Sequence, residues 1–178
     1  MKRREIIAAL GAFTIGIKPV RGAKPDRIKP QVGDVLVHAF GEKAGVVIQS
    51  DDIETDRVFA FPMSPEGVVR RGSLHNQVTL LRLDESLMSV KTKRHAAGPI
   101  LAVSAACTHT GCEVSGWEPE TNELVCPCHG SRFDVLDASR VLLGPAAKPL
   151  ALLPIANIEG SFQVTGKFSR RVGPEPAF

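Results

Sequence analysis

Two short boxes decide the fold of this chain: Cys107-Thr-His-Thr-Gly-Cys112 and Cys126-Pro-Cys-His-Gly-Ser131. Together they contain all four Cys and two of the five His of the sequence. Each box pairs one Cys with one His, as Cys-x-His in the first and Cys-x-x-His in the second. The stretch between them predicts a hairpin over 117–124 with its turn at 120–122. Such a hairpin brings the two boxes side by side at one end of a small sheet.

Soft thiolates and imidazoles that converge in this way indicate a transition-metal site. The residues leave open a structural zinc site with two Cys and two His, a [2Fe–2S] cluster with two Cys on one iron and two His on the other, and two disulfides without a metal. Zinc fingers normally take both Cys from one segment and both His from another. Here each box supplies one of each, and Cys112 and Cys128 are additional cysteines that a zinc site does not need.

The two boxes resemble the paired motif of the Rieske iron–sulfur proteins. The additional cysteines are similar to those of the cytochrome bc1/b6f-type branch and its relatives, such as the small subunit of arsenite oxidase. The resemblance covers residues 107–134 and extends to Gly144-Pro-Ala146, which matches the family's proline loop. It implies a Rieske [2Fe–2S] cluster, with Cys107 and Cys126 on the buried iron, His109 and His129 on the outer iron, and a disulfide between Cys112 and Cys128. Export favours that disulfide, because exported cysteines tend to be oxidised.

The resemblance also implies residues that tune the cluster. Gly111 and Gly130 would let backbone amides approach the sulfurs, and the Ser131 hydroxyl would donate to a bridging sulfide. The predicted tuning set is Gly111, Gly130, Ser131, Phe133 and Pro145.

Three features depart from the family pattern. Thr110 stands where quinol-oxidising members usually have Leu, and Phe133 stands where high-potential members usually have Tyr. The linker before the domain is rich in Pro and Lys rather than in Gly and Ala. These departures count against a standard bc1 complex.

The N-terminus predicts export. Arg3-Arg4 precede an apolar run over 6–17, which resembles a twin-arginine signal. As a helix this run spans about 18 Å, short of a hydrocarbon core of about 30 Å. We therefore expect an export signal or an N-terminal anchor over 1–22, a linker over 23–30 and a periplasmic domain; a basic amphipathic surface helix is the alternative for 1–22.

Charge and composition exclude several other classes of protein. The chain has 178 residues, of which 43% are hydrophobic, so it can form a packed core. No apolar stretch approaches about 18 residues, which excludes a polytopic membrane protein. Residues 1–30 hold eight basic and two acidic side chains, a net charge of +6, and the remainder holds 14 basic and 17 acidic side chains, a net charge of −3. The net charge of the domain therefore does not indicate a nucleic-acid partner.

Many short apolar runs between turn residues predict an all-β protein. The expected strands are 35–38, 45–48, 57–61, 78–83, 99–103, 123–125, 141–143, 150–153 and 161–164, with one short helix over 84–89. We expect a Rieske fold over 31–178: an antiparallel sandwich or barrel base from about 31–97 and 148–178, with a cluster-binding subdomain inserted at about 98–147. Lys91-Thr-Lys-Arg94 is expected to be a solvated loop, with a docking patch as the alternative.

The predicted function is one-electron transfer through the cluster outside the cytoplasmic membrane, with no substrate chemistry of the chain's own. The main hypothesis is an electron-transfer subunit or carrier of a larger exported oxidoreductase, such as a molybdenum enzyme. Its redox partner would be a cytochrome, a copper protein or a large oxidoreductase subunit. The alternative is the iron–sulfur subunit of a bc1-type quinol:cytochrome c oxidoreductase, with quinol as a further partner. Two further hypotheses are a ferredoxin of a ring-hydroxylating oxygenase and a binding module without redox function.

Overall fold

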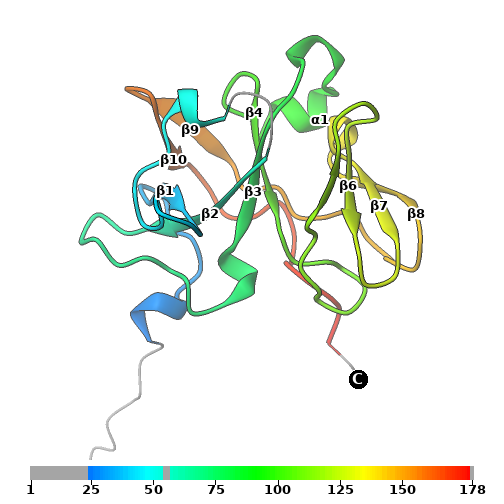
Figure 1. The fold of residues 1–178 in the computed structure, drawn as a ribbon, viewed down its shortest axis with the longest axis horizontal. Helices are drawn as coiled ribbons and strands as arrows, with labels where there is room; N and C mark the ends of the chain where they lie inside the picture. The colour runs from blue at the N-terminus through cyan, green and yellow to red at the C-terminus, as the bar shows by residue number, and fades with distance from the viewer. Residues whose placement is uncertain (1–23, 54–56, 177–178) are drawn as a thin grey trace, which may run out of the picture.

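The computed structural model describes residues 24–53 and 57–176, which form two antiparallel sheets (Figure 1). The larger sheet has the strand order β4-β3-β2-β1-β10-β9 and the smaller the order β5-β6-β7-β8. The strands of the larger sheet are β1 (Val35–His38), β2 (Val58–Met63), β3 (Val78–Arg82), β4 (Ile100–Ser104), β9 (Ile155–Ile158) and β10 (Ser161–Val164). Those of the smaller sheet are β5 (Gly116–Glu118), β6 (Glu123–Cys126), β7 (Ser131–Asp134) and β8 (Arg140–Leu143).

Helix is almost absent from the described residues. One turn of α-helix, α1 (Val90–Lys93), is joined by five short 3-10 turns: η1 (Pro25–Arg27), η2 (Ser50–Asp52), η3 (Leu74–Asn76), η4 (Glu85–Leu87) and η5 (Val135–Asp137). None of these is long enough to cross a membrane. The all-β prediction is therefore confirmed for the part of the chain that the structure describes.

Strand β4 is shared between two hydrophobic cores. All five of its residues are buried, and side chains alternate between the two faces of a strand. Leu101 and Val103 pack into the core beneath the smaller sheet, whereas Ile100 and Ala102 pack into the core of the larger sheet. The smaller sheet is thereby held against β4, at the place where the first Cys/His box leaves the larger sheet.

The predicted subdomain boundary at about residue 98 differs from the sheet boundary. Residues 100–104 pair with β3 over their whole length, so they belong to the larger sheet. The smaller sheet begins at Gly116, and its first hairpin pairs Trp117 with Leu124, as the sequence predicted. Lys91–Arg94, expected to be a loop, lies in and just after α1, because the Ser89 hydroxyl accepts the Thr92 N–H and caps the turn.

Two predicted strands are wrong. Residues 45–48 make one isolated bridge, Val47 with Val37, because the segment begins in a tight turn in which Gly45 has φ +84°. Residues 150–153 make one isolated bridge, Leu152 with Val103 of β4, and do not form a strand. Leu150 and Leu152 face one core and Leu153 the other, as side chains of an extended segment beside β4 do. Strands β7 and β9 were not predicted. The predicted helix over 84–89 is the shorter η4, capped by the Asp84 carboxylate on the Ser86 N–H.

The end of the predicted linker is docked on the domain. The Asp26 carbonyl accepts the Gly72 N–H at 2.9 Å, and the Ile28 carbonyl accepts from Asn76 Nδ2 at 2.8 Å. A Cβ on Gly72 would stand 2.6 Å from the side chains of Arg27 and Asp26, so any larger residue at this position would require them to move. The predicted export signal over 1–22 lies outside the described residues.

Candidate metal centre

The two boxes form two loops with the same backbone turn. The first loop, Cys107–Cys112, follows β4, and the second loop, Cys126–Ser131, joins β6 to β7. In the first, the Gly111 N–H donates to the Cys107 carbonyl at 3.0 Å, and in the second the Gly130 N–H donates to the Cys126 carbonyl at 3.0 Å. Both glycines have positive φ, +84° and +69°, a conformation that side chains with a Cβ rarely adopt. The repeated Gly of the boxes therefore closes each loop.

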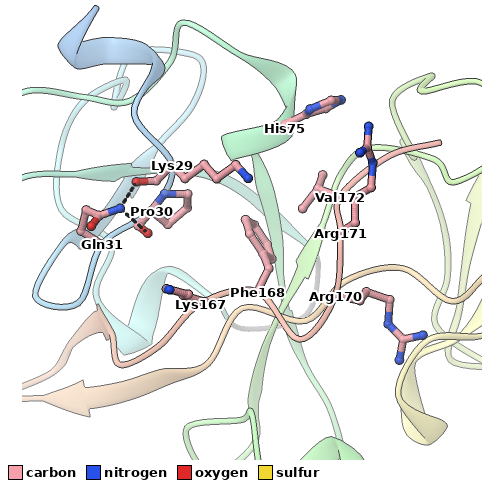
Figure 2. A pocket seen from close by; sticks show the side chains of 9 residues that line it. All are labelled: Lys29, Pro30, Gln31, His75, Lys167, Phe168, Arg170, Arg171 and Val172. Carbon is pink, nitrogen blue, oxygen red and sulfur yellow. Dashed lines mark hydrogen bonds between the residues drawn. The ribbon is translucent and has the colours of Figure 1, made fainter. Parts of the chain in front are cut away.

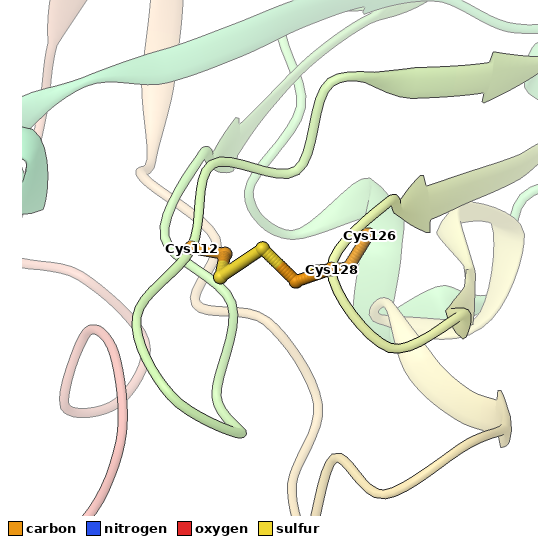
Figure 3. Close-up of side chains that lie close together, drawn as sticks. All are labelled: Cys112, Cys126 and Cys128. Atoms are coloured by element: carbon orange, nitrogen blue, oxygen red, sulfur yellow. A yellow bond between two sulfur atoms is a disulfide. The ribbon is translucent and has the colours of Figure 1, made fainter.

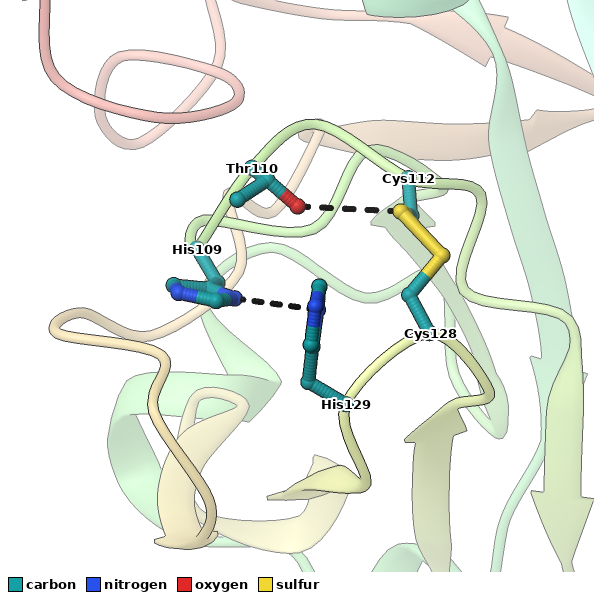
Figure 4. The surroundings of a disulfide bond; sticks show 5 residues. All are labelled: His109, Thr110, Cys112, Cys128 and His129. Carbon is teal, nitrogen blue, oxygen red and sulfur yellow. Dashed lines mark hydrogen bonds between the residues drawn. A yellow bond between two sulfur atoms is a disulfide. The ribbon is translucent and has the colours of Figure 1, made fainter.

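The two loop histidines lie together at the solvent edge (Figure 4). His109 Nδ1 is 3.3 Å from His129 Nδ1, and the rings are nearly perpendicular, with centroids 4.7 Å apart. His109 is half-buried and His129 is exposed. Both Nδ1 atoms thus face one shared space, as two imidazole ligands of one metal ion would.

The two cysteines that precede these histidines are free and buried. Cys107 and Cys126 are each 1% exposed and belong to the same hydrophobic core. Burial raises the pKa of the Cys107 thiol, and the neighbouring Cys126 thiol raises it further, while the backbone N–H groups of His109 and Thr110 donate to the sulfur and oppose the shift. Two adjacent buried thiols that form no disulfide suit metal ligation, since a bound metal removes the cost of burying thiolate.

A disulfide joins the two loops. Cys112 of the first loop is bonded to Cys128 of the second, which is the pairing that the family resemblance implies. Cys126 Sγ lies within 4.8 Å of both disulfide sulfurs (Figure 3), and Thr110 Oγ1 lies 3.7 Å from Cys112 Sγ (Figure 4). The disulfide therefore holds the two loops together next to the Cys126 thiol.

The segment Gly144–Ala146, which we call the proline loop, covers the start of β7. The Ala146 N–H donates to Ser131 Oγ at 3.1 Å, and both residues are buried. The Ser131 hydroxyl has thereby accepted a hydrogen bond and keeps its own proton to donate. Phe133, two residues further along the same face of β7, is fully buried in the core that contains Cys107 and Cys126. Pro145 is exposed at the tip of the loop.

The C-terminal tail is a support of the site that the sequence did not reveal. A Cβ on Gly111 would be 3.5 Å from Pro174, so the tail packs on the first loop. Glu175 pairs with Lys148, whose carbonyl accepts the Thr108 hydroxyl at 2.6 Å. Nothing in the Gly-Pro-Glu-Pro sequence of the tail signals this contact.

The donor set fits a two-iron cluster. Two buried thiols and two imidazoles at the solvent edge match a centre with two sulfur ligands on one iron and two nitrogen ligands on the other. Comparison with known proteins agrees: residues 46–155 match the Rieske [2Fe–2S] domain.

Two curated relatives are named "Cytochrome bc1 complex Rieske iron-sulfur subunit". The one from Streptomyces lividans is 41% identical over 162 residues, which cover 82% of this chain and 94% of the relative. The one from Streptomyces coelicolor is 33% identical over 97% of this chain, which spans only 53% of that relative's length. Among solved structures, the cyanobacterial plasma membrane Rieske protein PetC3 from Synechocystis PCC 6803 is 26% identical, with a TM-score of 0.46 over 67% of this chain and 97% of that one. The family match and the relatives establish that this chain belongs to the Rieske [2Fe–2S] family and carries a cluster of that type.

Proposed function

We propose that this protein is the Rieske subunit of a bc1-type quinol:cytochrome c oxidoreductase. The observation that carries the proposal is the likeness to the Streptomyces lividans subunit along nearly its full length. The sequence alone favoured another exported oxidoreductase because of Thr110 and the linker. The relatives support the bc1-type alternative better, and two local departures weigh less than a match of 41% identity.

Four residues are proposed as ligands: Cys107 and Cys126 on the buried iron, and His109 and His129 on the outer iron. When bound, the cluster supplies reversible one-electron oxidation and reduction. The buried cysteines hold the inner end away from water, because each is only 1% exposed. The two imidazoles provide the exposed edge at which an electron can leave.

His129 is proposed as the group that meets quinol. Its Nδ1 faces His109, and the residue is exposed, so Nε2 on the other side of the ring is open to a ligand. Nε2 can accept a hydrogen bond from a quinol hydroxyl and then take its proton. The disulfide and the proline loop fix the two loops, so this contact requires no rearrangement of the site.

The proposed location is the outer face of the cytoplasmic membrane. Arg3-Arg4 and the apolar run over 6–17 supply the export signal or anchor. The twin-arginine route carries folded proteins, which suits a domain whose cluster is inserted before export.

An inhibitor experiment in native membranes tests the assignment. A quinol-site inhibitor is added to membranes that contain the reduced protein, and the EPR spectrum of the cluster is recorded with and without it. A bc1-type subunit predicts a shift of the spectrum, because the inhibitor occupies the position of quinol beside His129. Thr110→Leu serves as the comparison, since it restores the residue usual in quinol-oxidising members and should keep the shift. An unchanged spectrum, together with co-purification of a different oxidoreductase, would overturn the proposal in favour of the carrier function.

A further inference from the structure

A groove lined with basic side chains lies between the two ends of the described chain. Its volume is about 530 Å³, and it lies between residues 29–31 and residues 167–172, with His75 at one side (Figure 2). We call it the basic groove. Its lining residues are Lys29, Pro30, Gln31, His75, Lys167, Phe168, Arg170, Arg171 and Val172. No carboxylate belongs to this lining.

The cations of the groove are not neutralised by the part of the chain that the structure describes. Elsewhere, basic side chains pair with acids: Arg70 with Asp34, Arg132 with Glu123, and Arg140 with Asp134. Lys29, Lys167 and Arg170 form no ion pair with any described carboxylate. These side chains are exposed, so water and salt screen their mutual repulsion, but their positive charge is left for a negative ligand to neutralise.

A smaller cavity of about 260 Å³ extends the positive surface. It is lined by Lys91, Arg94, His95, Ala138, Leu152, Ser169 and Arg170. Arg170 belongs to both cavities, so basic side chains continue from the groove to α1. Residues 31–178 carry a net charge of −3, and this local excess of cations is therefore not a general property of the domain.

The groove also offers apolar contacts. Phe168 packs against the core of the larger sheet, and Val172 and Pro30 join it in the lining (Figure 2). A bare inorganic anion would leave these contacts and most of the volume unused. A polypeptide segment that presents carboxylates beside apolar side chains would use both.

The tail connects the groove to the metal centre. Arg171 Nε–H donates to the Pro174 carbonyl at 3.2 Å, and Pro174 packs on Gly111 of the first loop. Gly173, between them, lies against His75, where a Cβ would be 2.9 Å from Nε2. A protein seated in the groove would therefore lie beside the loop that carries His109.

We propose that the basic groove binds an acidic segment of the protein that exchanges electrons with the cluster. This inference rests on the proposed electron-transfer function, and it adds that the redox partner presents an acidic surface to this protein. Positive charge in the groove raises the rate of encounter with an acidic protein and orients it.

Electron transfer to two soluble c-type cytochromes tests the groove. One cytochrome is acidic and the other basic, with similar midpoint potentials, and the cluster-loaded full chain is mixed with each in a stopped-flow instrument at low and high salt. Wild type should reduce the acidic cytochrome faster, with a rate that falls as salt increases. Lys167→Glu should lower that rate about tenfold at low salt and much less at high salt. The matched control is Arg71→Glu, an exposed residue outside both cavities with the same change in net charge, and it should alter the rate less than about twofold.

Two further measurements keep the outcomes separate. Calorimetric titration with the acidic cytochrome measures binding without electron transfer, and wild type should bind more tightly than Lys167→Glu. Equal binding and equal rates in Lys167→Glu and Arg71→Glu would overturn the groove proposal while the electron-transfer function stands. Loss of binding to anionic phospholipid vesicles in Lys167→Glu, with an unchanged rate to the acidic cytochrome, would also overturn it and assign the groove to lipid. A cluster that is reduced but transfers no electron to either cytochrome, with wild-type binding intact, would instead contradict the proposed function.

Discussion

Gly144 lies directly on Ser131. A Cβ at residue 144 would stand 2.6 Å from Ser131 Cα and 2.8 Å from its nitrogen, and Gly144 has φ +89°. Both the contact and the backbone conformation therefore require glycine. This close approach lets the proline loop cover β7 and brings the Ala146 N–H to the Ser131 hydroxyl.

Gly144→Ala should push the proline loop away from the metal centre. The new methyl group meets backbone atoms that cannot rotate aside, so we expect a loss of about 1–3 kcal/mol in stability and a faster loss of the cluster. The decay of the cluster's visible absorbance in the presence of an iron chelator measures this. Gly67→Ala is the matched control, because Gly67 has a similar φ of +83° but nothing within 4 Å of its notional Cβ. Equal decay in the two variants would show that strain alone, and not contact with Ser131, is responsible.

Ser131→Ala should lower the midpoint potential. The Ser131 hydroxyl accepts from Ala146, so its proton is free to donate to sulfur of the bound cluster, and such a bond favours the more negative reduced state. A difference of about 1 kcal/mol between the redox states corresponds to about 40 mV for one electron.

Phe133→Tyr should shift the potential upward by tens of millivolts, because it adds a hydroxyl to a chain that has no Tyr. Protein-film voltammetry at one fixed pH measures both; equal potentials in wild type and Ser131→Ala would disprove the bond.

The Cys112→Ser/Cys128→Ser double variant should still assemble a cluster but retain it poorly. The disulfide joins residues 16 apart, and closing a loop of that length contributes about 3 kcal/mol to stability. Urea unfolding should show this loss, and the half-life of the cluster should shorten. A double variant as durable as wild type would mean that the proline loop and the tail hold the two loops without it.

The residues proposed as ligands could be singled out from the sequence because they lie close together in it. The Cys-x-His and Cys-x-x-His motifs give the types of donor atom and their spacing. The glycine in each box is explained by the positive φ that closes its loop. The contact of Pro174 with Gly111 was not predictable, because it joins a tail without periodicity to a distant loop. The basic groove was missed for the same reason: Lys29 and Lys167 meet only through the tertiary fold. Residues 150–153 show that an apolar run can line two cores while making only one isolated bridge to a neighbouring strand.

Asp52 should stabilise the fold in a pH-dependent way. Hydrogen bonds from Lys43 and from the Gln49 N–H lower the pKa of the Asp52 carboxyl from 3.8 to about 2. A carboxyl with a lowered folded-state pKa contributes stability above the unfolded value, and that stability is lost as the pH falls from about 4 through about 2. Because Lys43 is largely exposed, we expect Asp52→Asn to cost only about 1 kcal/mol at neutral pH.

Urea unfolding at several pH values measures this effect. The difference between wild type and Asp52→Asn should shrink toward zero near pH 2. Asp51→Asn, at the exposed neighbouring residue, is the control and should change stability by less than about 0.5 kcal/mol. A difference that is constant with pH would contradict the role assigned to the Asp52 charge.

The ligand set is tested most directly by pulsed EPR of the reduced, cluster-loaded protein. Nitrogen couplings from two histidines are expected in wild type, since His109 Nδ1 and His129 Nδ1 share one space. Chemical analysis of the same sample should find about two irons and two acid-labile sulfides per chain. A spectrum without nitrogen coupling, or a protein that holds one zinc and no iron after expression with iron and sulfide supplied, would contradict the account.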